Sequence, residues 1–202
     1  MLYPVGDGRL LGLGHEVVGG SHIDSGLRLS HFDVSNLANP VQLDSLHSEG
    51  HMESLYDQNA LYYDPTESRI GLPWFGPLAP VPADSVVSEG PSRGANFYVI
   101  TPGEMTFEKH ISHQQFIPTE CWGVESHFGR SDTGFDIQRI INVNKEIYAV
   151  SPFGLTVYGR DLSQPKSTLI FQDGTRACAQ MISAYMPRCG TNELPPAPPI
   201  RE

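Results

Sequence analysis

The feature of this sequence that most constrains its fold is a repeated order of short strand signals separated by tight turns. A strand signal here is a run of β-branched, aromatic or aliphatic residues bounded by Gly, Pro, Asn or Asp. Three sets of such runs follow one another: 10–15, 26–34 and 40–46, then 59–63, 69–73, 95–100 and 105–111, and then 137–143, 146–150, 154–159 and 167–171. The sequence therefore predicts up to four strands in each of three repeated units.

Two inserts make the spacing of the units uneven. Without them, the period is roughly 40 to 50 residues, the range of four-stranded propeller blades. We therefore predict an all-β fold of about three four-stranded antiparallel propeller blades, forming a partial or open β-propeller. The expected divisions are blade 1 at 1–48, blade 2 at 55–112 with an insert at 75–94, a second insert at 113–136, blade 3 at 137–172, and a C-terminal extension with a Pro-rich tail at 173–202.

Charge and hydropathy limit the partners of this chain. Lys and Arg number 13 against 23 Asp and Glu, a formal charge of −10, and an acidic surface repels nucleic-acid phosphates. No run approaches the roughly 20 apolar residues of a membrane-spanning helix. The first residues lack the basic and apolar segments of a signal peptide. We therefore expect no nucleic-acid partner and no membrane span.

Several runs carry a family resemblance, most of them in the first third of the chain: Leu10-Leu11-Gly12-Leu13-Gly14, Gly26-Leu27-Arg28-Leu29-Ser30-His31-Phe32-Asp33-Val34-Ser35, Ala38-Asn39-Pro40-Val41-Gln42-Leu43-Asp44, Glu53-Ser54-Leu55-Tyr56-Asp57 and Ile147-Tyr148-Ala149-Val150-Ser151. In these residues the chain resembles the C-terminal β-propeller domain of secreted bacterial proteins, a family distantly related to WD repeats. The resemblance implies export to a secreted, periplasmic or cell-surface location. It implies no reaction.

Motifs for catalysis and cofactor binding are incomplete. The run Gly12-Leu13-Gly14 begins like a dinucleotide fingerprint, but the third glycine and the following helix are missing. No Gly-x-Ser-x-Gly elbow and no Gly-x-x-x-x-Gly-Lys loop occurs. We therefore assign no catalytic residue, no metal ligand and no cofactor.

Polar residues beside the strands have both functional and structural interpretations. His47, His51 and Glu53 share one loop, where they could bind a metal or supply a base, or simply form a hydrated loop. His31 is expected to be half-buried and hydrogen-bonded within its strand. The carboxylates of Asp33, Asp57, Asp64 and Asp161 lie next to turns, where Asp typically accepts hydrogen bonds from backbone amides, and we predict that they cap these turns.

Aromatic and cysteine residues supply the remaining candidates. Trp74 and Trp122 lie at the two inserts, where an exposed indole could stack on a sugar or anchor a protein, or could cover a blade edge. Cys178 and Cys189 are close enough in sequence to form a disulfide in an oxidising compartment. Because Cys121 would be left over, three unpaired thiols are the alternative.

Together these features favour a non-catalytic interaction or scaffold module of an exported bacterial β-propeller protein, which binds a protein or carbohydrate through loops on one face. The alternatives are a propeller-type enzyme, a glycosidase or lyase, and a carbohydrate-binding module. Three blades cannot close a ring, because each blade buries both faces against neighbours. We therefore expect missing blades or self-association to complete the structure.

Overall fold

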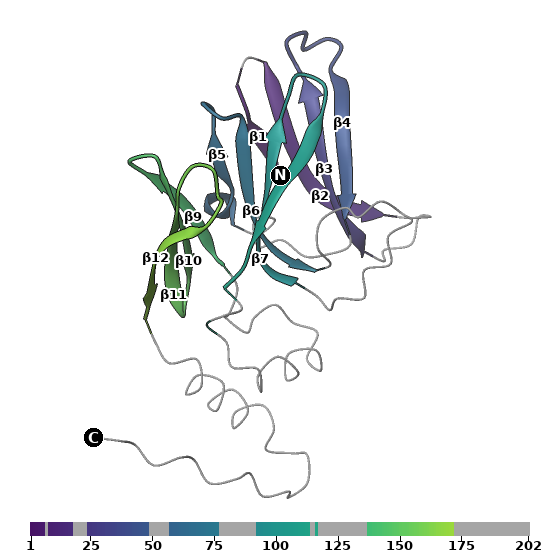
Figure 1. The fold of residues 1–202 in the computed structure, drawn as a ribbon. Helices are drawn as coiled ribbons and strands as arrows, with labels where there is room; N and C mark the ends of the chain where they lie inside the picture. The colour runs from purple at the N-terminus through teal and green to yellow at the C-terminus, as the bar shows by residue number, and fades with distance from the viewer. Residues whose placement is uncertain are drawn as a thin grey trace, which may run out of the picture.

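The computed structural model describes residues 1–6, 8–17, 24–48, 57–76, 92–113, 116 and 137–171. In this part of the chain it contains three four-stranded antiparallel sheets (Figure 1) and no α-helix, and therefore no helix able to cross a membrane. Each sheet is a meander of consecutive strands, and the three sheets do not close on themselves. The predicted all-β class with three four-stranded antiparallel units in an open arrangement is confirmed.

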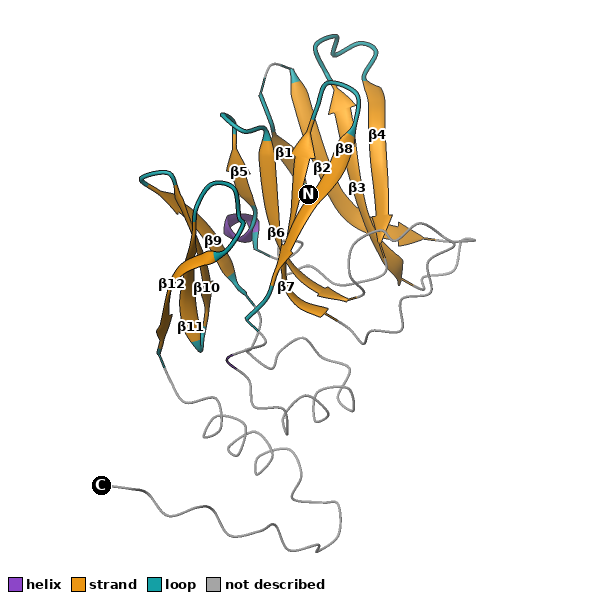
Figure 2. Cartoon of the chain, viewed as in Figure 1, coloured by secondary structure: helices purple, strands orange, loops and turns teal. Residues whose placement is uncertain are grey.

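The strands follow the chain in simple order. The first sheet contains β1 (Leu2–Pro4), β2 (Arg9–Val17), β3 (Asp24–Asp33) and β4 (Val41–Ser48). The middle sheet contains β5 (Tyr62–Asp64), β6 (Arg69–Gly76), β7 (Ser92–Ile100) and β8 (Met105–Ile111). The third sheet contains β9 (Arg139–Val143), β10 (Glu146–Ser151), β11 (Gly154–Tyr158) and β12 (Pro165–Ile170). One turn of 3-10 helix, η2 (Gln58–Ala60), precedes β5 (Figure 2).

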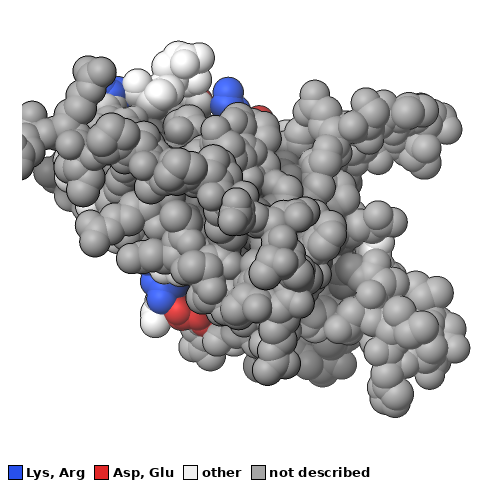
Figure 3. All heavy atoms as spheres, turned by 90° about the horizontal axis from the view of Figure 1, so that it is seen from below, with Lys and Arg blue, Asp and Glu red and all other residues white. Residues whose placement is uncertain are grey.

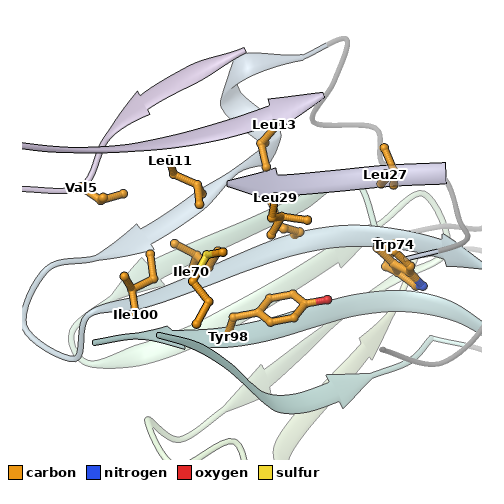
Figure 4. Close-up of a cluster of buried hydrophobic side chains, with 11 residues drawn as sticks. Val5, Leu11, Leu13, Leu27, Leu29, Ile70, Trp74, Tyr98 and Ile100 are labelled. Carbon is orange, nitrogen blue, oxygen red and sulfur yellow. The ribbon is translucent and has the colours of Figure 1, made fainter. Parts of the chain in front are cut away.

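Two apolar clusters join the three sheets, one between the first and middle sheets and one between the middle and third sheets. The cluster between the first and middle sheets, which we call the first junction, contains Leu11, Leu29, Ile70, Trp74 and Tyr98 (Figure 4). The cluster between the middle and third sheets, the second junction, is built from these buried residues: Tyr62, Ala95, Phe97, Ile111, Ile137, Ile140, Ile147, Ala149, Tyr158 and Leu162. The middle sheet therefore buries both of its faces, whereas each outer sheet buries one face against it.

Alternation along β6 explains how one strand serves both junctions. Ile70, Leu72 and Trp74 belong to the first junction, and successive side chains of a strand point to opposite faces. Gly71 therefore faces the third sheet, where a Cβ atom would lie 2.8 Å from Cε1 of Phe97 and 2.9 Å from Cδ1 of Ile140. The absence of a side chain at Gly71 allows the two sheets to approach.

The residues of one tight turn determine how the first two strands of the third sheet are joined. Asn144 and Lys145 have φ angles of 52° and 67° and join β9 to β10, whose closing pair is Val143 and Glu146. Two successive positive φ angles are the signature of the hairpin turn whose twist matches that of the strands, and Asn is suited to its first position. The prediction of a turn at these two residues is confirmed.

Apart from shifts of strand ends, such as the extension of β6 and β7 into the predicted insert at 75–94, the structure differs from the predicted strands at two places. β1 is absent from the prediction, because three residues that include Pro4 are too short to show alternation. The predicted strand at 59–63 is divided, since Gln58–Ala60 forms η2 and only Tyr62 and Tyr63 enter β5. The side chain of Asp57 accepts a hydrogen bond from the amide of Asn59 and starts this helical turn.

Candidate functional site

The predicted binding residues do not gather in the described structure. Trp74 is 1% exposed and packs in the first junction, so its indole is part of the core and is not on the surface. His47 is exposed near the end of β4. His51, Glu53, Trp122 and the cysteine pair Cys178 and Cys189 lie outside the described residues, as does most of both inserts. Their binding and disulfide roles stay predictions.

Three charged side chains form an ionic contact across the second junction. Arg160, in the loop between β11 and β12, donates from Nη2 to Oδ2 of Asp64 at 3.1 Å and lies 3.1 Å from Oε1 of Glu67 through Nη1. Asp64 also caps the turn after β5 by accepting from the amide of Thr66 at 2.8 Å. Burial by itself would raise the pKa of Asp64, but these hydrogen bonds outweigh it and lower the pKa.

A second contact extends this ionic group within the middle sheet. Arg69 donates from Nε and Nη2 to the two carboxylate oxygens of Glu108, both at 2.6 Å, and from Nη1 to the backbone carbonyl of Arg160 at 2.6 Å. The bonds to Glu108 raise the pKa of Arg69. A guanidinium with this fork geometry is held in one orientation by its paired bonds. Arg69 thereby fixes the β11–β12 loop against the middle sheet.

Charged groups elsewhere in the described structure also occur in pairs. Arg139 and Asp57 form an ion pair that joins β9 to the segment before η2, and Lys166 and Glu146 form one between β12 and β10. In the view from below, basic and acidic atoms of the described residues lie beside each other at the lower left (Figure 3). In the described part of the chain, no group of three or more His, Cys, Asp or Glu residues could hold a metal ion.

Polar contacts also cross the first junction. The carboxylate of Asp44 on β4 accepts a hydrogen bond from the amide of Met105 on β8 at 2.7 Å. The hydroxyl of Tyr63 donates to the carbonyl of Val5 at 2.7 Å. Both bonds satisfy backbone groups of the neighbouring sheet, so they fix the register of one sheet against the other.

Each junction also contains a buried histidine. His31 on β3 is 0% exposed, and neither ring nitrogen has a hydrogen-bond partner within the described residues. The prediction of a half-buried, hydrogen-bonded His31 is therefore wrong, because its strand face is closed by the middle sheet. His113, two residues after β8, is 2% exposed and shares a 2.8 Å hydrogen bond through Nδ1 with Oγ of Ser151 in the third sheet.

Among the described residues, the third sheet exposes several large apolar side chains. Ile141, Val143 and Leu169 are 47%, 45% and 58% exposed. Ile141 pairs with Tyr148 and Leu169 pairs with Leu155, so these residues lie on the face opposite to Ile147 and Ala149 of the second junction; we call it the outward face of the third sheet. An apolar sheet face of this kind is commonly covered by another protein element. The outward face is therefore the candidate interaction site in the described structure.

Sequence reasoning predicted the wrong environment for His31 and missed both the burial of His113 and the outward face. Along β10, partly exposed residues of the outward face alternate with buried ones, but Tyr148 and Val150 are as apolar as Ile147 and Ala149, so the sequence pattern did not indicate which face is exposed. The sequence did indicate two of the carboxylates that form ion pairs, Asp57 and Asp64, because they are among the predicted turn caps. Asp33, Asp57, Asp64 and Asp161 were predicted to cap turns, and each accepts a hydrogen bond from an amide two residues later.

A family model described as a beta propeller domain matches residues 1–161. Neither the curated proteins nor the solved structures contain a match to this chain. The match spans all of the first and middle sheets and the third sheet as far as the loop that follows β11.

Proposed function

Since this chain belongs to the beta propeller domain family, we propose that it is a non-catalytic interaction module of an exported bacterial propeller protein, whose open sheets are completed by further blades. The proposal rests on one observation: the middle sheet buries both faces, whereas the outer sheets each bury one. Stacking is the way in which this fold removes apolar surface from water, so an open end predicts a neighbour.

The outward face of the third sheet is suited to such a neighbour. It carries Ile141 and Val143 on β9 and Leu169 on β12, all of which retain large exposed areas. The first sheet is open in the same way, since Leu2 is exposed and pairs with Gly12, on the opposite face from Leu11 and Leu13. A blade of the same kind, from additional chain or from a second copy, would cover these side chains.

Binding of an external partner is assigned to loops at the ends of the sheets. Many charged side chains of the described residues are committed to contacts within or between sheets, as the pairing of Arg69 with Glu108 and of Arg160 with Asp64 illustrates. Loops on a rigid β scaffold are the usual place for recognition. Export follows from the bacterial family that the sequence resembles, and fractionation of cells that express the full-length gene would test it.

The experiment that tests open-end pairing is light scattering after size exclusion over a range of protein concentrations. We expect the wild-type chain to self-associate, and the double variant I141D and L169D to do so much less, because a charge on the outward face opposes burial. L37D is the matched control, since Leu37 is exposed in the turn between β3 and β4. A wild-type chain that stays monomeric at every concentration and unfolds in one sharp transition would contradict the proposal.

A further inference from the structure

The buried histidine of the second junction joins two sheets through a single polar contact. Nδ1 of His113 lies 2.8 Å from Oγ of Ser151, and Oγ of Ser151 donates to the carbonyl of Gly154 at 3.3 Å. Because the serine proton is used in that bond, the hydrogen-bond network assigns the imidazole proton to Nδ1, which donates to Oγ. Nε2 then carries the lone pair, and this atom is buried without a partner in the described residues.

A proton added at this atom would have no acceptor among the described residues. The ring of Phe116 packs edge-on against His113 at a centroid distance of 4.7 Å, and the described neighbour on the third sheet is the neutral Ser151. No charged group of the described chain acts on His113, so burial alone lowers its pKa to about 4. The second junction is therefore built around the neutral imidazole.

The first junction also contains a buried histidine, His31, but charged side chains lie near it. His31 pairs with Leu11 on one side and with Asp44 on the other, all on the face that meets the middle sheet. Burial is the main cause that lowers its pKa; Arg9 also lowers it, whereas Asp44 and Asp33 oppose the shift. The middle sheet contributes the amide of Met105, which already bonds to Asp44. A charged His31 would compete with that amide for Asp44.

We propose that the stack of sheets is acid-sensitive, because each junction holds one buried neutral histidine whose protonation loosens the contact between the sheets. This inference is independent of the proposed interaction role. At neutral pH both imidazoles are neutral and the junctions are closed. As the pH falls, the separated sheets bind protons at His31 and His113 more readily than the packed sheets do, and the equilibrium moves toward separation.

The expected size follows from His113. With a pKa of about 4 in the packed state and 6.5 when exposed, its contribution to the equilibrium constant for opening rises roughly 20-fold between pH 7 and pH 5. The rise begins below pH 6.5 and ends near the lower pKa. Hydrogen exchange of the full chain, corrected for the intrinsic effect of pH on exchange rates, would measure this opening for β9, β10 and β11 separately from the other strands.

Two variants and one control test the proposal. H113N keeps a side-chain donor for Ser151 but cannot take up a proton, and H31F replaces the imidazole of the first junction with a ring that cannot take up a proton. We expect each variant to lose most of the pH dependence at its own junction, while H15N, at an exposed position on β2, behaves as the wild type. If H113N and H31F both keep the wild-type pH dependence, the proposal is overturned.

A measurement on the unmodified chain covers the case in which a variant does not fold. Titration of the histidine ring signals by nuclear magnetic resonance gives the pKa of each imidazole directly. The proposal requires the pKa values of His31 and His113 to lie below the ordinary histidine value of 6.5. The pKa of His113 should lie about two units or more below that ordinary value. A titration of either ring at or above 6.5 overturns it.

Discussion

The close approach of the middle and third sheets at Gly71 predicts a large effect for a single methyl group. In G71A the added Cβ would lie 2.8 Å from Cε1 of Phe97, 2.9 Å from Cδ1 of Ile140 and 3.1 Å from Cδ1 of Tyr62. All three are buried ring or methyl groups, so they have little room to move. Overpacking of this kind costs about 1–3 kcal/mol. Replacing glycine by alanine also restricts the unfolded chain, which returns about 0.4–1 kcal/mol.

The expected net effect of G71A is a loss of about 1–2 kcal/mol in the free energy of unfolding, after the overpacking and unfolded-chain effects are combined. The matched control is G14A on β2, where no atom lies within 4 Å of the added Cβ. Urea denaturation followed by tryptophan fluorescence would give both values. If G71A were as stable as G14A, the two sheets would not be in contact at Gly71, and the stacked arrangement would be refuted.

Three further substitutions test the junctions. In Y63F the bond to the carbonyl of Val5 is lost, and we expect a loss of about 0.5–1.5 kcal/mol in urea denaturation. W74A should cost about 3–5 kcal/mol if the indole is part of the core, whereas a surface tryptophan would cost little. Because the pKa of Asp64 is lowered in the folded chain, its stabilising contribution is present above 3.8 and is lost as the pH falls through the folded value; D64N should therefore flatten the stability curve only in that acidic range. If stability fell as steeply with pH below about pH 4 in D64N as in the wild type, that result would argue against the contact with Arg160.

Most of the fold could be predicted from the pattern of strand residues and from the residues of the turns. The pair Asn144 and Lys145 and the capping aspartates are local signals, and local signals can be interpreted from one sequence. The environment of Trp74 could not be inferred in this way, because an indole next to an insert is compatible with either surface or core. Its burial depends on the first sheet, which covers that face of β6.

The environments of the two buried histidines also could not be predicted from the sequence. His31 lies between Ser30 and Phe32, a mixed context that predicts partial exposure. Its actual burial is set by residues distant in sequence, and no periodicity in β3 reports on them. The bond between His113 and Ser151 spans 38 residues and crosses from one sheet to another, so only the packed structure could identify that pair.

The two-sided burial of the middle sheet has a consequence for how sequences of this kind can diverge. Residues 70–74 on β6 and 94–98 on β7 are all buried, whereas β10 alternates between buried and partly exposed positions. Mutations at every second position of an end sheet can accumulate while one face stays open, but residues 70–74 and 94–98 offer no such neutral positions. A further sheet packed on an end sheet would bury the open face of that end sheet and would restrict its residues in the same way. The sequence of the covered sheet would then change more slowly than it did while one of its faces was exposed.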